Sequence, residues 1–162
     1  MSNDLTPVHL YILLHLKRAK VDYAKMMAKM SHVDLDIVNS CIEDLTKAGL
    51  IERDSGSAIK RSKAKFKKAF EVRKHHTYYR LSRKGEQFVR KIDRRWLREY
   101  FDSTIGEGAF DVVTLMAEGK NFEEACKSVG FDGAEDFRLF KLVTPKGRMT
   151  RLLELILAFA GI

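Results

Sequence analysis

The chain has 162 residues, of which 45 % are hydrophobic, and a formal net charge of +8 at neutral pH. This length fits one ordinary domain or two small ones, with enough apolar residues for a folded core. The longest apolar run, LLELILAF, contains Glu154 and is too short to span a bilayer, and the N-terminal MSNDLTPVHL lacks the positive charge of a signal peptide. Cys41 and Cys126 are isolated in helical patterns, which is typical of free thiols in a reducing compartment. We therefore expect a cytoplasmic protein.

The positive charge is concentrated in one internal block. Residues 60–98 carry 16 basic and 3 acidic side chains, a net charge of +13, whereas residues 1–59 carry −1 and residues 99–162 carry −4. The densest stretch is 60–74, with eight Lys or Arg and a single acid, Glu71. Such asymmetry indicates a polyanionic partner, either nucleic acid or an anionic membrane face. An acidic protein partner and a merely solvated loop are the other interpretations.

The first part of the chain predicts three short helices. The first begins at Pro7 with Thr6 as its N-cap, and the second follows a cap at Asp22. The third begins after a cap at Asp34 and ends at Gly49, which suits a left-handed helix stop. Apolar residues recur along this third helix at helical spacing, namely Val38, Ile42 and Leu45.

Two strands and a long helix are expected next. LIER after Gly49 predicts a short strand, and the alternating pattern of FEVRKHHTYYRL predicts a second one beyond a basic loop. Ser82 then caps a helix that the periodicity extends without a break to about Asp102. Gly85, in its first turn, would allow a strand and this helix to approach closely.

Three helices followed by a β-hairpin are the order of elements in a winged helix-turn-helix domain. The phrase LTKAGLIERDSG…HTYYRLSRKGEQFVRKI resembles winged-helix regulators of the MarR and PadR type over residues 7–93. In those regulators a recognition helix ends in Leu-x-x-x-Gly-Leu-Ile and the wing returns through Tyr-x-Leu-Ser/Thr-x-x-Gly. The residues that match are Leu45, Gly49, Leu50 and Ile51, then Tyr79, Leu81, Ser82 and Gly85. The chain most closely resembles an archaeal winged-helix family of unknown function.

The resemblance implies a mainly α fold with a small β-hairpin, of the α+β class. We expect a winged helix-turn-helix domain over residues 1–93 with a long basic wing at about 54–76. The long helix would connect it to a helical domain over residues 94–162. FEEACKSVGFDGAEDFRLFK in that domain resembles the second helix-turn-helix of AraC-type regulators, and its acidic opening at Glu135 and Asp136 favours a helical hairpin of structural role.

The C-terminal helix is apolar over much of its surface. A domain of this size can barely hide so many apolar side chains, so they indicate either a dimer surface or the domain's own core, and we expect a homodimer. The side chains are Leu152, Leu153, Leu155, Ile156, Leu157, Phe159 and Ile162.

In the winged-helix frame the basic loop lies along the DNA backbone, where Lys and Arg add affinity by releasing counterions. Asn39 and Ser40 on the third helix would read base edges, whereas Asp36, Glu43 and Asp44 have the wrong sign for a groove between phosphates. Either binding is dominated by the wing and weakly sequence-specific, or this helix contacts a protein. The predicted nucleic-acid-binding residues are Asn39, Ser40, Lys47, Lys60, Arg61, Lys63, Lys65, Lys67, Lys68, Arg73, Lys74, Arg83 and Lys84.

These patterns predict a protein that binds double-stranded DNA, as a transcriptional regulator or chromatin-associated factor. The alternatives are a winged-helix adaptor in transcription or replication machinery, and an RNA binder. No catalytic or metal-binding residues are predicted, because the sequence has no Cys-x-x-Cys, no carboxylate–His spacing of a metal site and no Gly-rich loop after a strand. We therefore expect no enzyme activity, no cofactor and no membrane partner.

Overall fold

The computed structural model describes residues 5–55 and 76–162. These residues are mainly helical with one small three-stranded antiparallel sheet, which confirms the predicted α+β class. The chain divides into two compact units, residues 12–89 and residues 1–11 together with 90–162, here called the central unit and the terminal unit. The predicted domain boundary at residue 93 stays a prediction.

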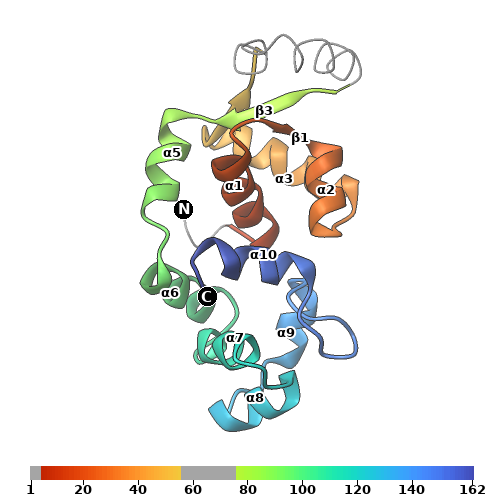
Figure 1. The fold of residues 1–162 in the computed structure, drawn as a ribbon, viewed down its shortest axis with the longest axis vertical. Coiled ribbons are helices and arrows are strands. Elements are labelled where there is room, and N and C mark those ends of the chain that lie inside the picture. The colour runs from red at the N-terminus through yellow and green to blue at the C-terminus, as the bar shows by residue number, and fades with distance from the viewer. Residues whose placement is uncertain (1–4, 56–75) are drawn as a thin grey trace. The chain divides into compact units, whose positions relative to one another are not determined.

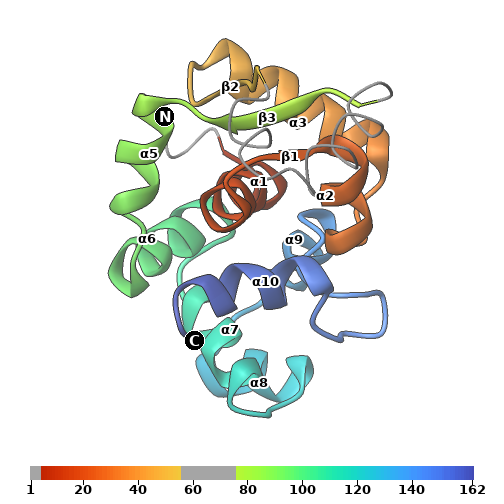
Figure 2. The ribbon, with the colours of Figure 1, turned by 45° about the horizontal axis from the view of Figure 1, so that its top comes forward.

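The central unit contains the sheet. Its elements are the second part of α1 (Pro7–Ala19), then β1 (Asp22–Tyr23), α2 (Ala24–Ser31), α3 (Leu35–Lys47), β2 (Ile51–Arg53), β3 (Tyr78–Leu81) and α5 (Arg83–Arg90) (Figure 1). Strand β3 lies between β1 and β2 and is antiparallel to both, as Figure 2 shows. The register pairs Ile51 with Leu81 and Tyr23 with Tyr78. The strand pairing thus joins the chain before α2 to the chain after the basic segment.

Near the start of the chain, the predicted helix cap at Thr6 is confirmed and the one at Asp22 is wrong. Helix α1 begins at Pro7, and the Thr6 hydroxyl accepts a hydrogen bond from the His9 backbone N–H at 3.4 Å. The prediction that Asp22 caps the second helix is wrong, because Asp22 lies in β1. Its carboxylate is held instead by His15, whose Nε2 lies 2.7 Å from Oδ2. This contact links α1 to the first strand, and the partner seven residues earlier was not apparent from the sequence.

The end of α3 confirms the predicted stop. Gly49 has a φ of 76°, in the left-handed region, and the Leu50 N–H donates to the Leu45 carbonyl at 3.0 Å. This is the arrangement that ends many helices at glycine. At the other end, Asp34 occupies the N-cap position but its side chain makes no capping hydrogen bond, so the predicted cap by that side chain is wrong.

The expected unbroken helix from Ser82 to Asp102 is also wrong. The chain forms α5 and then α6 (Arg94–Thr104), with a break between them. Asp93 is extended there, with φ −132° and ψ −171°, and its carboxylate accepts a hydrogen bond from the Trp96 N–H at 2.8 Å. A new N-cap therefore starts a second helix at the point where the periodicity alone predicted continuation.

The terminal unit is helical. It contains α6, α7 (Ala109–Ala117), α8 (Phe122–Val129), α9 (Ala134–Leu139) and α10 (Arg151–Phe159). Phe101, Phe110 and Phe137 are fully buried in it. The Tyr100 hydroxyl donates to the Leu5 carbonyl at 2.6 Å, and burial raises the pKa of Tyr100 well above its ordinary value. This hydrogen bond fastens the start of the chain to α6.

The predicted helical hairpin of the terminal unit is confirmed. Asn121 caps α8 by accepting from the Glu124 N–H at 2.8 Å, and α8 and α9 form the expected pair of helices. Of the apolar residues near the C-terminus, Leu152, Leu153, Ile156 and Leu157 are buried within the single chain. The homodimer stays a prediction.

Candidate nucleic-acid interface

Helix α3 buries one apolar stripe and exposes most of its polar residues. Val38, Cys41, Ile42 and Leu45 are buried, at spacings of three and four residues. The opposite side exposes a polar face, here called the α3 face, which consists of Asp36, Asn39, Ser40, Glu43 and Lys47. A helix with one apolar stripe packs that stripe inward and leaves the other side in solvent, so the two predicted base-reading residues are accessible.

The charge of the α3 face is mixed rather than basic. Lys47 Nζ lies 3.0 Å from Glu43 Oε1, an i,i+4 pair in which both side chains are largely exposed. Such pairs are weak and are screened by salt, so Lys47 can exchange this partner for another anion at small cost. Asp36 adds a further negative charge near the start of the helix. The acids therefore remain the main obstacle to placing this face against phosphates.

The start of α5 is built onto the end of α3. The Ser82 hydroxyl donates to the Gly49 carbonyl and accepts from the Gly85 N–H at 3.0 Å, which confirms Ser82 as the cap of this helix. Lys84 Nζ donates to the Ala48 carbonyl at 3.0 Å. A cation at a helix C-terminus is favourable because the last carbonyl groups carry partial negative charge. The predicted residue Lys84 is thus held at the end of α3.

Glycine at position 85 makes this junction possible. A Cβ added at Gly85 would lie 2.0 Å from the Leu50 carbonyl oxygen, a backbone atom that cannot turn away. The same oxygen accepts a hydrogen bond from the Ser82 N–H at 3.0 Å. The close approach predicted from the sequence is therefore confirmed, and it fixes α5, with its exposed Arg83, next to the strand that follows α3.

The ends of β2 and β3 carry an ion-pair cluster where the chain enters and leaves the basic segment. Arg80 Nε lies 3.1 Å from Glu52 Oε1, and Arg80 Nη1 lies 3.3 Å from Asp54 Oδ1. The Asp54 side chain is fully buried, and the Asp54 N–H continues the strand pairing by donating to the Tyr78 carbonyl at 2.9 Å. The cluster fixes the two ends of the segment side by side.

One family model, described as an uncharacterized protein conserved in archaea (DUF2250), matches residues 3–92, more than half of the chain. The chain belongs to this family. Comparisons with curated proteins and with solved structures gave no match. This bears out the expected membership of an archaeal family of unknown function, and the winged-helix resemblance stays a prediction. All thirteen predicted nucleic-acid-binding residues, from Asn39 to Lys84, fall within the part shared with the DUF2250 family.

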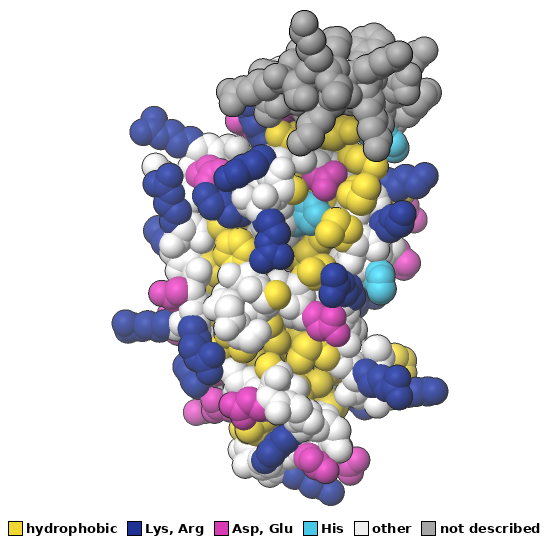
Figure 3. Space-filling model, viewed as in Figure 1, with side chains coloured by type: hydrophobic (Ala, Val, Ile, Leu, Met, Phe, Trp, Pro, Cys, Tyr) yellow, Lys and Arg dark blue, Asp and Glu magenta, His cyan; other side chains and the backbone are white. Residues whose placement is uncertain are grey.

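The structure places five of those thirteen residues. Asn39, Ser40 and Lys47 are exposed on α3, and Arg83 and Lys84 are exposed on the first turn of α5. Figure 3, in the view of Figure 1, shows Lys and Arg side chains gathered over α5. The remaining eight, Lys60, Arg61, Lys63, Lys65, Lys67, Lys68, Arg73 and Lys74, lie outside the described residues.

Sequence reasoning missed the Arg80 cluster. Nothing in the local pattern marks Asp54 as buried, because the sequence that follows it is rich in polar residues. In the described ranges, 5–55 and 76–162, no group of three His, Cys, Asp or Glu is arranged to hold a metal ion. No helix in that part of the chain is long and apolar enough to cross a membrane.

Proposed function

We propose that this DUF2250 protein binds double-stranded DNA as a transcriptional regulator, with a winged helix-turn-helix domain over the family-matched part of the chain. The observation that carries the proposal is the placement of charge. The segment that joins the paired strands β2 and β3 contains the eight basic residues and single acid of positions 60–74. In a winged helix-turn-helix domain, the segment at this place is the wing.

The topology of the central unit supports this assignment. Helices α1, α2 and α3 precede the β2–β3 pair, and a short strand between α1 and α2 completes the sheet in the order β1-β3-β2. In this arrangement α3 takes the position of the recognition helix. The exposure of Asn39 and Ser40 suits contacts to base edges, for which amide and hydroxyl side chains have the required donors and acceptors.

The electrostatics favour binding through the phosphate backbone. Arg83 and Lys84 extend the positive charge onto α5, whereas the α3 face contributes two acids and one lysine. Each phosphate neutralised by Lys or Arg releases counterions and strengthens binding without reading sequence. We therefore infer strong dependence of affinity on salt and modest sequence preference.

The deciding experiment is a fluorescence-anisotropy titration of a random-sequence DNA duplex across a salt series. The variant Lys63→Ala, Lys65→Ala, Lys67→Ala, Lys68→Ala should lower the slope of log affinity against log salt by about 3–4, because each phosphate contact contributes about 0.9. The matched control removes the same charge from the terminal unit through Lys120→Ala, Lys127→Ala, Arg148→Ala and Arg151→Ala. If the two variants change the slope equally, net charge rather than the wing drives binding.

A protein-binding adaptor is the second candidate, and the surface of the central unit favours it. Met30 and Leu35 are 42 % and 41 % exposed, large fractions for apolar side chains, and they occur close to the acids of α3 in the sequence. Failure of the wild type to bind DNA at low salt would reject the DNA proposal and leave α3 as a protein-contact face. Equal affinity for an RNA duplex of the same sequence would assign the wing to duplexes in general.

A further inference from the structure

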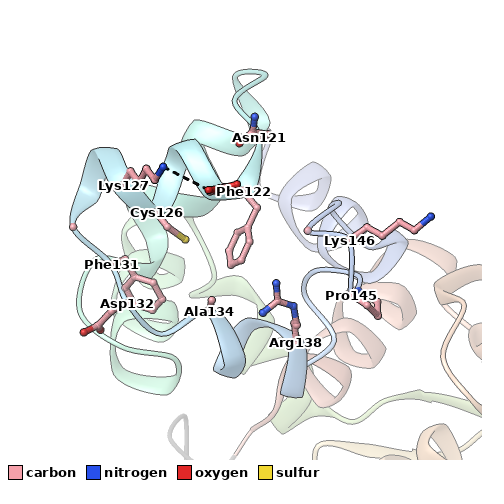
Figure 4. Close-up of a pocket in the computed structure, with 13 residues that line it drawn as sticks. Asn121, Phe122, Cys126, Lys127, Phe131, Asp132, Ala134, Arg138, Pro145 and Lys146 are labelled. Carbon is pink, nitrogen blue, oxygen red and sulfur yellow. Dashed lines mark ion pairs between the residues drawn. The ribbon is translucent and has the colours of Figure 1, made fainter.

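The terminal unit contains an open cleft of about 680 Å³, outside the part shared with the DUF2250 family. It lies between α8, the turn at residues 130–133, α9 and the loop at residues 145–147. Figure 4 shows the Phe122 ring, the Cys126 sulfur and the Arg138 guanidinium pointing into the same space. The volume falls within the range of small-molecule sites, which combine apolar walls with a few convergent polar groups.

The rings of Phe122 and Phe131 form the two aromatic walls of the cleft, and both pack against the backbone of a glycine. A Cβ added at Gly133 would lie 2.6 Å from the Phe131 ring, and one added at Gly147 would lie 3.4 Å from Phe122. Both rings also meet the buried Phe137 edge to face, with centroids 5.1 Å away for Phe122 and 5.4 Å for Phe131. The walls therefore belong to the core of the unit and are held in place before any ligand binds.

Arg138 supplies a positive charge to this space. Its Cζ lies 5.9 Å from the centroid of the Phe122 ring, and its Nη1 lies 3.0 Å from Glu135 Oε1. The Glu135 side chain is 90 % exposed, whereas that of Arg138 is 36 % exposed. An ion pair with so exposed a partner is weak. A guanidinium is a planar fork of N–H donors, so this arginine can also bind a carboxylate along its other edge.

Besides Arg138, the charged residues that line the cleft are two lysines and two acids, Glu123 and Asp132. Asp132 is exposed, and Figure 4 shows its carboxylate pointing away from the Arg138 guanidinium. Lys127 pairs with Glu123 at 3.5 Å, on the outer side of α8, and Lys146 points away from the cleft in Figure 4. Burial raises the pKa of the Cys126 thiol, against the opposing effect of Arg138, so the thiol stays neutral at pH 7. Cys126 therefore adds an apolar surface rather than a competing negative charge.

We propose that this cleft binds a small aromatic carboxylate, with the carboxylate on Arg138 and the ring between the Phe122 and Phe131 walls. The site combines one cation, planar and partly desolvated, with two aromatic rings. An anionic group gains most from the guanidinium, and a flat apolar body gains most from the rings. This inference is independent of the DNA-binding proposal, because it rests on the terminal unit alone.

The test uses the full-length chain and three probes of increasing size, namely benzoate, 2-naphthoate and 4-phenylbenzoate, each compared with its neutral amide. Titrations are followed by ¹H–¹⁵N NMR shifts, which should appear at Gly130, Gly147 and the Arg138 side chain. At least one carboxylate should bind about tenfold more tightly than its amide, because the amide lacks the charge-assisted contact. Arg138→Gln should abolish that difference, Arg138→Lys should keep part of it, and Arg148→Gln, outside the cleft, should leave it unchanged.

A second readout follows Cys126 directly and does not require a variant to fold. Cys126 is partly exposed and Cys41 is buried, so N-ethylmaleimide should label Cys126 first. The carboxylate that binds should slow this labelling, and its amide should not. The proposal is overturned if all three carboxylates fail to shift the NMR signals at about 10 mM, where even millimolar binding would be visible. The proposal is also overturned if a carboxylate binds no more tightly than its amide, or if a bound carboxylate does not slow the labelling of Cys126.

Discussion

The central unit contains the helix pair α2–α3, and the terminal unit contains the helix pair α8–α9. In both pairs the first helix ends in a left-handed residue, but the second helices differ in length and burial. His32 is the C-cap of α2, with a φ of 59°, and the His32 N–H donates to the Ala28 carbonyl. Gly130 is the C-cap of α8, with a φ of 77°, and the Gly130 N–H donates to the Cys126 carbonyl. The second helix then differs. Helix α3 has 13 residues and exposes a polar face, whereas α9 has 6 and buries Phe137.

The difference shows that two helices joined by a left-handed turn do not by themselves decide how much of the second helix stays accessible. Thirteen residues give α3 more than three turns, enough for a buried stripe and an accessible face along its length. Six residues give α9 less than two turns. Phe137 of this helix is buried in the core, and Arg138 lines the cleft. The resemblance of the second pair to AraC-type regulators stays a prediction. The two pairs differ in the length of their second helix.

The largest expected effect is the loss of Phe137 from α9. Phe137→Ala should lower the free energy of unfolding by about 3–5 kcal/mol, because it leaves a cavity under both aromatic walls of the cleft. Urea denaturation followed by circular dichroism measures this loss. Leu139→Ala on the same helix, at a side chain 74 % exposed, should change stability by less than about 0.5 kcal/mol. Equal effects of the two substitutions would mean that α9 is not anchored by its phenylalanine.

Helix α3 depends instead on the junction that follows it. Gly85→Ala should destabilise the central unit by about 3 kcal/mol, since the new methyl group meets the Leu50 carbonyl oxygen and the backbone has to move. Thermal unfolding compared with Gln87→Ala, an exposed position on the same helix, separates this clash from the general effect of alanine. A wild-type unfolding midpoint in Gly85→Ala would show that α5 does not pack closely against the Leu50 carbonyl.

Sequence reasoning succeeded at three positions where the cause was local, although the local caps predicted at Asp22 and Asp34 were wrong. Gly49, Ser82 and Gly85 were predicted because a left-handed stop, a cap and a close approach each require particular residue types within a few positions. It failed at Asp93, since an aspartate on the polar side of a helical pattern looks the same whether it is exposed within a helix or caps a new one.

Features that depend on distant partners could not be predicted. The burial of Asp54 follows from strand pairing with Tyr78, and the cleft forms only when the loop at 145–147 returns to Phe122. No spacing in the sequence encodes these contacts. For the same reason Arg138 was not among the predicted site residues, and its position over the Phe122 ring became apparent only from the fold.

A substitution on the α3 face tests which partner that face meets. Asp36→Asn with Glu43→Gln should strengthen DNA binding about fivefold at low salt if α3 lies near phosphates, because two repulsive charges are removed. The control on the other helix pair is Glu123→Gln with Glu124→Gln on α8, which should change DNA affinity little. Anisotropy titrations of both variants give the comparison. Equal affinities for wild type and the α3 variant would place DNA elsewhere and favour a protein partner for this face.

The smallest effects concern the turns that the two pairs share. Gly130→Ala places an L-residue in the left-handed region at a cost of about 1–2 kcal/mol, while the more restricted unfolded chain returns about 0.4–1 kcal/mol. A net loss of about 0.5–1 kcal/mol should remain, since an added Cβ at Gly130 meets no atom within 4 Å. His32→Gly removes the strain of a non-glycine residue with a φ of 59°. This gain should exceed the cost of a more flexible unfolded chain and stabilise the central unit by about 0.5 kcal/mol.

Urea denaturation at a fixed protein concentration resolves both changes when the single variants and the double variant are measured together. The substitutions lie in different compact units, so their effects should add within about 0.5 kcal/mol. Stabilisation by Gly130→Ala would show that the α8–α9 turn does not need its left-handed residue. The two turns would then differ in backbone conformation, and the structural difference between the pairs would begin at the turn rather than in the length of the helix that follows.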